Sequence, residues 1–555
     1  MTRYIFVTGG VLSSVGKGTV CASIGKILQV RGFTVSAIKI DPYLNVDAGT
    51  MNPYMHGEVY VCEDGGEMDL DLGTYERFLN INVSREANIT TGLVYREVIE
   101  KERRGDYLGK CVQIIPHITD EIKRRLRNVA EKTKVDVILV ECGGTIGDIE
   151  GLPFYEAFRQ MRLEEGMQNT VFVHVPLVPI LDATKEQKSK PAQHSIQELR
   201  RIGLQPDLIV ARSRKMLDPD PHDKIALFGS IDRKAVFTSP NVRNIYEIPL
   251  ILDKQGLGDF VCRRFGLSNR KPDWSSWRQI VNSYINAEHE VKIAVCGKYA
   301  MLSDSYVSIN EALRCGAAAA SSRVSIDWIE TEVFEKEPNS IEALAEYDGI
   351  LVPGGFGVRA TEGKIAAIRY AREKNIPFLG ICFGFQLAVI EYARNICSLE
   401  NSNSTELNPN PQHPVVFLLP EQNKVSYKGG TMRLGASPVV IKADTLAYRL
   451  YGVNLAYERH RHRYEVNPAY IQTLIDHGLI FSGTTPDETR MEILELPNHY
   501  FFFATQFHPE FKSRPGRPDP AYYGFIKASL DKKLGNTTLT LDREALYEAE
   551  SKYLR

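Results

Sequence analysis

Two series of alternating strand-like and helix-like segments constrain the fold of this chain more than any other feature. Short apolar runs without polar alternation are typical of strands buried on both faces of a parallel sheet. In the first series these runs cover residues 5–7, 35–40, 135–140, 171–175 and 208–210. Helix-like stretches such as 20–31 and 118–132 separate them. This alternation predicts an α/β domain with a doubly wound parallel sheet.

The second series predicts another α/β domain. Its apolar runs cover residues 291–295, 349–352, 376–380 and 501–505. At 555 residues the chain is too long for one hydrophobic core, so two large domains are expected. The pattern breaks between the series, and the chain closes with a Thr-rich turn and a predicted helix over residues 542–553. We therefore predict a first domain, a linker, a second domain and a C-terminal tail at 1–266, 267–290, 291–532 and 533–555.

Composition indicates an ordinary globular protein. Charged residues make up 25%, hydrophobic residues 43%, and the formal net charge is -2, which argues against a protein that coats nucleic acid. The nine cysteines include no Cys-x-x-Cys pair, which favours free thiols in a reducing compartment. No apolar run approaches the ~20 residues of a membrane span, and the N-terminus reads as a strand rather than a signal peptide. We expect a cytoplasmic protein with no nucleic-acid or membrane partner.

A cysteine between two glycines is the first candidate for catalysis. Cys382 stands in Gly-Ile-Cys-Phe-Gly directly after an apolar run, which resembles a nucleophile elbow at a strand-to-helix turn. His508 and Glu510 stand in Gln-Phe-His-Pro-Glu. A histidine can deprotonate the thiol and a carboxylate can orient that histidine. Cys382, His508 and Glu510 thus resemble the Cys-His-Glu triad of the class I glutamine amidotransferases, which hydrolyse glutamine and pass the ammonia to a second site.

A glycine-rich turn after the first strand is a candidate phosphate site. Residues 8–19 read Thr-Gly-Gly-Val-Leu-Ser-Ser-Val-Gly-Lys-Gly-Thr and open a helix. Backbone N–H groups, a helix N-terminus and Lys17 are what a phosphate group needs. The spacing departs from the common Gly-x4-Gly-Lys-Ser/Thr form, and a structural βα turn remains an alternative. Asp71 and Glu141 follow strand-like runs, where carboxylates can serve as Mg²⁺ ligands beside ATP.

Numerous motifs along the chain, all in order, resemble the CTP synthase family from about residue 2 to about residue 530. They are Lys39-Ile-Asp-Pro-Tyr, His56-Gly-Glu-Val, Asp69-Leu-Asp-Leu-Gly, Lys101-Glu-Arg-Arg-Gly-Asp-Tyr-Leu-Gly, Gly143-Gly-Thr-Ile-Gly-Asp-Ile-Glu, Lys188-Ser-Lys-Pro-Ala-Gln, Pro353-Gly-Gly-Phe-Gly and Glu458-Arg-His-Arg-His-Arg-Tyr-Glu-Val-Asn. The resemblance implies an amidoligase domain followed by a glutamine amidotransferase domain. It also implies conversion of UTP to CTP, in which ATP phosphorylates the uracil O4 and ammonia displaces the phosphate.

The resemblance assigns nucleotide-binding roles in the first domain. The residues implied to bind ATP are Ser14, Val15, Gly16, Lys17, Gly18, Thr19, Lys39, Asp71 and Val242. Asp71 and Glu141 are implied Mg²⁺ ligands. The residues implied to bind UTP or the product CTP are Ser13, Asp148, Ile149, Glu150, Lys188, Ser189, Lys190, Pro191, Ala192, Gln193 and Lys224.

The same resemblance assigns roles around the elbow. Gly355 and the Phe383 N–H are implied to form the oxyanion hole. The residues implied to bind glutamine are Gly355, Phe383, Gly384, Phe385, Gln386, Glu406 and Arg463. His56 falls at the synthase end of the family's ammonia channel, and Arg359 falls in the region where GTP activates the family.

The family also implies partners and assemblies: ATP, UTP, glutamine, GTP as an allosteric activator, CTP as product inhibitor, a homotetramer and, in some members, filaments. This chain departs from the family pattern at Phe383 and Phe385, where Leu and Met are usual, in the loop Val358-Arg-Ala-Thr, and beyond Lys533.

Two other functions remain open on the sequence. One is a different amidotransferase-coupled ligase with a similar phosphate loop, such as a cobyrinic acid diamide synthase, which lacks a Lys-Ser-Lys-Pro-type segment. The other is a structural or regulatory assembly protein, which retention of all three triad residues disfavours. The substrate that gains nitrogen and the rate of glutamine hydrolysis distinguish these functions.

Overall fold

The computed structural model describes residues 2–51, 56–268, 270–298, 303–419, 422 and 430–541. The chain forms two compact units. Unit 1 comprises Met1–Ala48 and Met68–Ser275, and unit 2 comprises Gly49–Glu67 and Ser276–Arg555. The helix that the sequence predicts over residues 542–553 lies outside the described residues.

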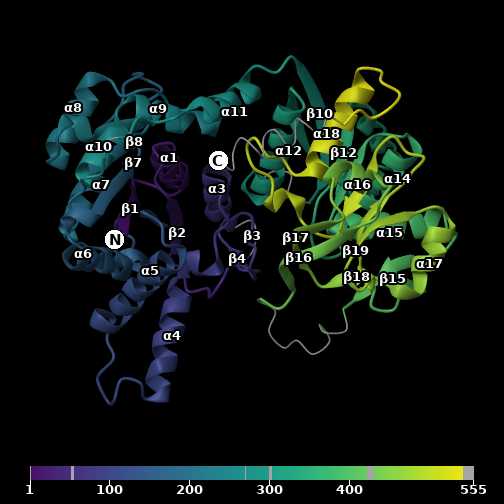
Figure 1. Ribbon diagram of the computed structural model, residues 1–555, viewed down its shortest axis with the longest axis horizontal. Helices are drawn as coiled ribbons and strands as arrows, with labels where there is room; N and C mark the ends of the chain where they lie inside the picture. Colours follow the sequence, from purple (N-terminus) through teal and green to yellow (C-terminus); the bar gives the residue numbers. More distant parts are fainter. Residues whose placement is uncertain are drawn as a thin grey trace. The chain divides into compact units, whose positions relative to one another are not determined.

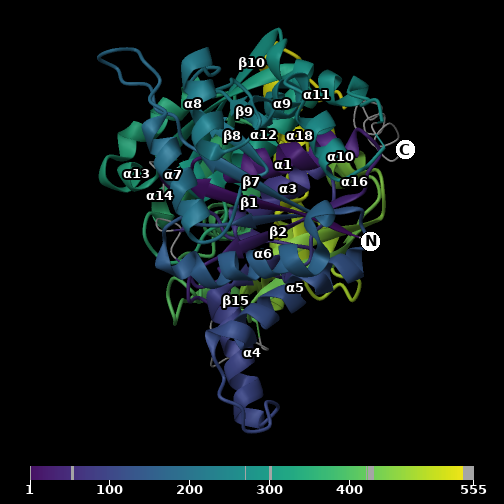
Figure 2. The same ribbon diagram turned by 90° about the vertical axis from the view of Figure 1, so that its left-hand side faces the viewer.

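Unit 1 contains the parallel sheet that the first series predicts. Its strand order is β5-β2-β6-β1-β7-β8-β9, and each neighbouring pair is parallel. The strands are β1 (Arg3–Gly10), β2 (Val35–Asp41), β5 (Asn88–Thr90), β6 (Val137–Cys142), β7 (Thr170–Pro176), β8 (Leu208–Arg212) and β9 (Val236–Ser239). The prediction of a doubly wound α/β fold is confirmed, because helices cover both faces of this sheet (Figure 2).

Alternation along each strand divides the core of unit 1 between these two faces. Tyr4 and Phe6 of β1 pack with α4 (Thr91–Arg104), α5 (Thr119–Thr133) and α6 (Leu152–Glu165). The intervening residues of β1 face the opposite way. On that opposite side lie α1 (Lys17–Gln29), α3 (Leu70–Leu79), α9 (Ile248–Lys254) and α10 (Leu257–Arg264) (Figure 1). Beside β8 and β9, α7 (Lys190–Arg201) and α8 (Pro219–Gly229) share an apolar cluster.

Unit 2 is built on a mixed sheet with strand order β11-β10-β12-β13-β21-β20-β19-β16-β17. The strands from β11 to β21 pair in parallel, and those from β21 to β17 pair antiparallel. Their bounds are β10 (His289–Gly297), β11 (Ser322–Glu330), β12 (Gly349–Val352), β13 (Phe378–Ile381), β16 (Arg433–Ile441), β17 (Leu455–His462), β19 (Ile480–Thr484), β20 (Met491–Glu495) and β21 (Phe502–Thr505). The sequence predicted strands at β10, β12, β13 and β21, whereas β11 and the antiparallel half were not anticipated.

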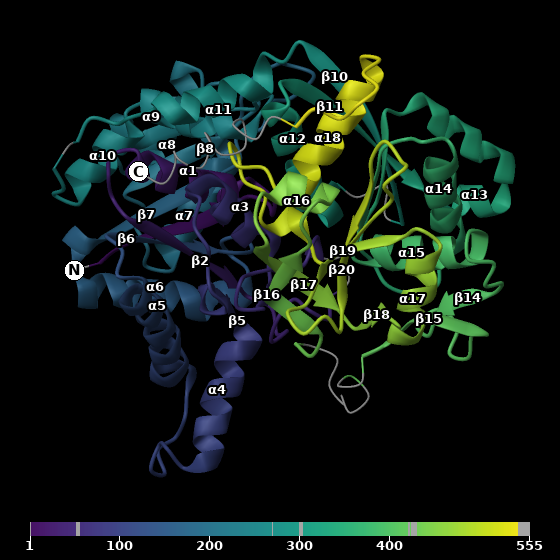
Figure 3. The same cartoon turned by 45° about the vertical axis from the view of Figure 1, so that its right-hand side comes forward.

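Helices also cover both faces of this second sheet (Figure 3). One face packs against α12 (Val307–Ala319), α16 (Leu446–Tyr451) and α18 (Pro520–Lys533). The other face packs against α14 (Thr361–Glu373), α15 (Phe383–Asn395) and α17 (Pro468–Asp476). Beside them lies a small sheet of β14 (Ser402–Ser404), β15 (His413–Leu418) and β18 (Tyr464–Val466). Strand β14 and the start of β15 lie within the Asn- and Pro-rich residues 398–414.

The Gly49–Glu67 segment belongs to unit 2, although its sequence position falls within the predicted first domain of residues 1–266. Its strand β3 (Tyr60–Val61) and Cys62 are fully buried. Burial of this short apolar run favours packing of the segment with unit 2. The order of residues along the chain does not reveal that packing. The contiguous first domain stays a prediction, and the contacts of this segment are described below.

The predicted linker and the start of the tail are both structured. Helix α11 (Ser275–Ile285) occupies much of the segment 267–290. After α18, Leu539 and Leu541 pack on the unit 2 core, and the Thr540 hydroxyl donates to Asp531 at 2.9 Å. Within the described parts of the chain, no helix has the length and apolar character needed to cross a membrane.

Candidate active site

Cys382 lies at a sharp turn between β13 and α15 in unit 2. Its backbone has φ 53° and ψ -97°, a conformation that costs a non-glycine residue free energy and that is concentrated at functional sites. The Cys382 N–H donates to the Thr505 carbonyl at 2.7 Å, which ties the turn to β21. Gly384 permits the turn, because a Cβ there would lie 2.2 Å from the Val352 carbonyl oxygen. The sequence motif therefore forms the strained strand-to-helix turn that it predicts.

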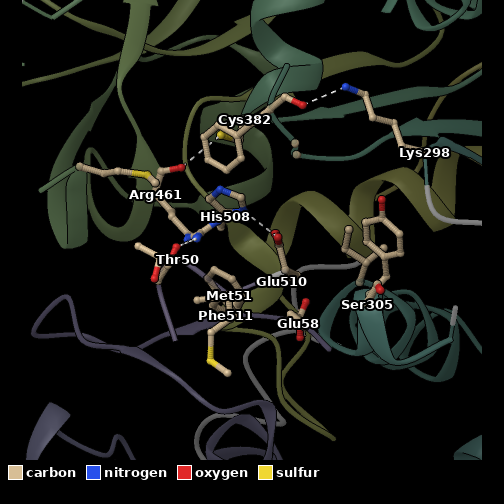
Figure 4. A pocket seen from close by; sticks show the side chains of 18 of the residues that line it. Thr50, Met51, Glu58, Lys298, Ser305, Cys382, Arg461, His508, Glu510 and Phe511 are labelled. Atoms are coloured by element: carbon tan, nitrogen blue, oxygen red, sulfur yellow. Dashed lines mark hydrogen bonds and ion pairs between the residues drawn. The ribbon is translucent and has the colours of Figure 1, made fainter. Parts of the chain in front are cut away.

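His508 and Glu510 lie beside this cysteine. His508 Nδ1 is 2.7 Å from Glu510 Oε1, and all three side chains are buried. Figure 4 shows the imidazole between Cys382 and Glu510. Burial alone would lower the pKa of His508, but the charge of Glu510 and the contact with Cys382 raise it to about 10. The three predicted catalytic residues are thus brought together.

A cavity of about 270 Å³ opens next to the three residues. Its lining includes Lys298 and Lys364, together with Thr50, Met51 and Glu58 of the Gly49–Glu67 segment. In Figure 4 these last three lie on the side of the cavity away from Cys382. The cavity therefore joins the cysteine to a segment that the sequence placed in another domain.

Two buried lysines lie around the predicted oxyanion hole. Lys364 Nζ lies over the Phe383 ring at 5.3 Å from the centroid, and a Cβ on Gly355 would come within 3.7 Å of the same nitrogen. Lys298 Nζ donates to the carbonyls of Phe356 and Gly357 at 2.8 and 2.6 Å. Burial lowers the pKa of Lys364 to about 7 and that of Lys298 to about 8. These lysines add positive potential where the backbone donors Gly355 and Phe383 are expected.

The residues predicted to bind glutamine differ in their environments. Glu406 accepts the Gly357 N–H at 2.8 Å, and burial raises its pKa. Gln386 donates to the Tyr464 carbonyl at 2.8 Å. Arg463 donates to Thr431 at 3.0 Å and also contacts Gln422. Gly384 and Phe385, in contrast, are buried in the helix α15 packing, where Phe385 joins the apolar core.

Two further predicted residues also fall in unit 2. Arg359 donates to the Lys298 carbonyl at 3.0 Å and lies 3.8 Å from Glu332. His56, the predicted channel residue, is half-buried in the Gly49–Glu67 segment.

The predicted phosphate loop lies in unit 1 between β1 and α1. Ser14 has φ 55° and Gly16 has φ 90°, so the loop turns through left-handed conformations before the helix. Ser13 and Ser14 are exposed, and Val15, Lys17 and Gly18 are buried, with Thr19 half-buried. Lys17 Nζ donates to the Gly144 carbonyl at 2.7 Å, and burial lowers its pKa. The strand, loop and helix start that a phosphate site requires are therefore present.

Lys39 contacts both of the predicted metal-binding carboxylates. Its ammonium contacts Asp71 and lies 2.9 Å from Glu141 Oε1 and 3.9 Å from Asp69. Burial would raise the pKa of Asp71, yet the charges of Lys39 and Lys17 lower it, whereas burial and the Asp71 charge raise the pKa of Glu141. Across the described ranges no group of three or more such side chains forms a metal site by itself. Two carboxylates fit Mg²⁺, which commonly takes its other ligands from phosphates and water.

The residues predicted to bind UTP or CTP are dispersed over several loops and helix starts. Lys188 pairs with Glu186 and Lys224 with Asp220, both at 2.6 Å. Asp148 accepts the Thr145 N–H at 2.6 Å. The remaining members are Ile149 and Glu150, which line a cavity of about 570 Å³, and Ser189, Lys190, Pro191, Ala192 and Gln193, which form the start of α7. Val242, predicted to bind ATP, follows β9 and is half-buried.

Sequence reasoning did not single out several residues around the cysteine. Lys298, Lys364, Arg459 and Arg461 all lie near it, and none had been assigned a role. A pattern that points to the two arginines is Glu458-Arg-His-Arg-His, where charged residues alternate in a strand and therefore occupy one face. The buried lysines leave no such pattern.

Comparison with known proteins gives consistent similarities over both units. Residues 3–267 match the family model described as CTP synthase N-terminus, and residues 301–528 match that of class-I glutamine amidotransferases. The chain is 57% identical to a CTP synthase of Thermococcus gammatolerans over 96% of this chain and 100% of that one. It is 53% identical to a CTP synthase of Methanocaldococcus jannaschii over 96% and 99%. A solved glutaminase domain of Trypanosoma brucei CTPS with bound acivicin is 39% identical, covering 43% of this chain and 94% of that domain, with a TM-score of 0.41.

Proposed function

This chain belongs to the CTP synthase family, and we propose that it makes CTP from UTP, ATP and glutamine. Glutamine is hydrolysed at Cys382 in unit 2, and the ammonia aminates UTP that has been phosphorylated by ATP. The observation that carries this proposal is the buried Cys382-His508-Glu510 arrangement, in a chain with high identity to CTP synthases over nearly its whole length.

The proposed glutaminase step follows from that arrangement. His508 takes the thiol proton, and the Cys382 sulfur attacks the side-chain carbonyl carbon of glutamine. The N–H groups of Gly355 and Phe383 hold the oxyanion, and His508 gives the proton to the departing nitrogen, which leaves as ammonia. Water then attacks the glutamyl thioester with His508 as base, and releases glutamate and the free thiol. Glu510 keeps the imidazole oriented throughout.

Binding of glutamine would rely on residues that now make local contacts. Arg463 can hold the α-carboxylate, because its planar fork suits a carboxylate. Glu406, which accepts the Gly357 N–H, is suited to an ammonium group. Gln386 completes the proposed set.

The proposed nucleotide chemistry lies in unit 1. Lys17 and the loop N–H groups would hold the ATP phosphates, with Lys39 beside them. Asp71 and Glu141 would hold Mg²⁺, which supplies charge neutralisation for phosphoryl transfer when bound. Lys188, Lys224 and Asp148–Glu150 would hold UTP or CTP. Lys39 would then exchange its carboxylate contacts for phosphate contacts.

Regulation, assembly and location follow the family. We propose GTP as an activator that acts near Arg359, CTP as product inhibitor, a homotetramer and a cytoplasmic location.

Purified protein tests the proposal directly. We expect CTP, followed by absorbance, when UTP, ATP, Mg²⁺ and glutamine are supplied together, with one glutamate released per CTP. Ammonium should replace glutamine. Hydrolysis of glutamine without amination of UTP under any nitrogen source would show that the chain is a different amidotransferase-coupled ligase.

A further inference from the structure

Strand β17 carries two arginines on one face and two histidines on the other. Arg459 and Arg461 alternate with His460 and His462, and successive side chains of a strand point to opposite faces. The four residues are therefore fixed in register by one short stretch of backbone.

The backbone of β17 contacts the catalytic residues. The His508 N–H donates to the Arg459 carbonyl at 2.8 Å. The Cys382 thiol donates to the Arg461 carbonyl at 3.6 Å, a contact drawn in Figure 4. A shift of β17 would therefore move acceptors that hold both the nucleophile and its base.

The side chains of the same two arginines hold the Gly49–Glu67 segment. Arg459 is fully buried and donates to the Tyr60 hydroxyl at 2.8 Å, to the Val61 carbonyl at 3.0 Å and to Glu63 at 3.0 Å. Arg461 donates to Glu67 at 2.8 Å and to the Gly49 carbonyl at 3.2 Å, which are the two ends of the segment. The guanidinium fork suits such divided contacts better than a lysine ammonium.

A second path runs from the segment to His508 through Phe511. The Tyr60 hydroxyl donates to the Phe511 carbonyl at 3.0 Å, and the two rings meet edge to face at 5.1 Å. Phe511 in turn stacks on the His508 ring, with centroids 5.2 Å apart. Tyr60 therefore contacts both Arg459 and Phe511, and each of these two residues contacts His508.

The opposite face of β17 is anchored to the sheet. His460 Nε2 lies 2.8 Å from Glu492 Oε2, and Arg433 lies 2.7 Å from the other oxygen of Glu492. All of these groups are buried or nearly so. Because the contact between His460 and the buried Glu492 holds the back of the strand, movement of β17 is restrained.

We propose that Arg459 and Arg461 are positioning residues that couple glutamine hydrolysis to retention of the ammonia it releases. They hold the Gly49–Glu67 segment as a wall of the Cys382 cavity, and they do so from the same backbone that supports the catalytic residues. With the wall in place, ammonia stays in the cavity; with the wall loosened, it escapes to solvent, where protonation removes its nucleophilic electron pair. This inference rests on the proposed function.

The test loosens the segment from its own side and leaves β17 and the triad unchanged. Tyr60→Phe removes the hydrogen bonds of the hydroxyl with Arg459 and with the Phe511 carbonyl, and Glu63→Gln removes the charge that faces Arg459. Both changes alter the volume little, and the two are combined. Glutamate and CTP are measured in the same reaction with saturating UTP, ATP, Mg²⁺ and glutamine. We expect the glutamate-to-CTP ratio of the double variant to rise to about two or more, while glutamine hydrolysis and ammonium-driven CTP formation stay within about threefold of wild type.

Tyr457→Phe with Glu488→Gln is the matched control, because both of these side chains are exposed and Tyr457 lies on the same strand. This control should keep a ratio of one. A ratio of one in the Tyr60→Phe, Glu63→Gln double variant overturns the inference, and so does an equal fall of both half-reactions, which would indicate a purely structural role. If the double variant does not fold, Glu63→Gln alone decides, with a ratio above one supporting and a ratio of one rejecting the coupling.

The same assay separates this inference from the proposed function. Wild-type protein that makes no CTP from ammonium would reject the proposed function itself. Wild-type protein that makes CTP, beside a double variant without excess glutamate, would reject only the coupling by Arg459 and Arg461.

Discussion

The backbone N–H of His508 donates to the carbonyl oxygen of Arg459 at 2.8 Å, and this one bond joins the predicted general base to the strand that grips the Gly49–Glu67 segment. The base is therefore positioned by two independent groups. Glu510 orients its ring through Nδ1, and β17 fixes its main chain. Loss of Glu510 should therefore affect the orientation of the ring, whereas a shift of β17 should affect the position of the main chain.

Cys382→Ser should abolish CTP formation from glutamine and leave formation from ammonium largely intact. A serine hydroxyl is far less acidic than a thiol, so glutaminase turnover should fall by roughly a thousandfold or more. The ammonium-driven rate is measured beside it, with thermal unfolding as a check on folding. A folded variant that has lost the ammonium-driven reaction as well would refute the assignment of the two half-reactions to different sites.

Lys17→Ala and Asp71→Asn should each remove CTP synthesis from either nitrogen source. Phosphoryl transfer depends on neutralisation of phosphate charge, and each change removes one part of it, with an expected loss of at least about a hundredfold. Basal glutaminase activity should survive in both variants. Near wild-type CTP formation from ammonium by either variant would show that the ATP site lies elsewhere.

Glu510→Gln should lower glutaminase turnover by on the order of a thousandfold or more, because the imidazole loses its orienting charge. It should also change the pH dependence of stability. Glu510 and Cys382 raise the pKa of His508 from 6.5 to about 10, so their contribution is fully present below pH 6.5 and is lost as the pH rises through 10.

Thermal unfolding of wild type and Glu510→Gln over this range measures that contribution. The stability advantage of wild type should be largest near pH 6 and should shrink toward pH 10. An advantage that grows with pH would mean that His508 is neutral in the folded protein near pH 7.

His56→Trp should uncouple the two half-reactions if ammonia passes this residue, as the family resemblance implies. The added bulk would block passage, and the triad and the phosphate loop would stay chemically intact. Glutamine hydrolysis should continue with CTP per glutamate well below one and with free ammonia in solution. An unchanged ratio would leave His56 as a packed loop histidine.

The sequence by itself was sufficient for the parts of this protein that depend on local pattern. Apolar runs in the first series predicted the parallel sheet of unit 1, because strands buried on both faces must be apolar throughout. Gly-Ile-Cys-Phe-Gly predicted the turn at Cys382, because that backbone geometry needs small neighbours, as the 2.2 Å approach at Gly384 illustrates. The order of the motifs indicated the family.

Tertiary structure alone decided which distant residues meet. Arg459 and Tyr60 are 399 positions apart, and their contact leaves no periodic trace in the sequence. The burial of Lys364, which lowers its pKa to about 7, likewise depends on the surroundings that α14 and the cavity provide. The antiparallel half of the unit 2 sheet was missed because strands such as β17 (Leu455–His462) carry alternating charged residues rather than a continuous apolar run. Local pattern determines elements and turns, whereas desolvation and long-range pairing arise only when the whole chain has packed.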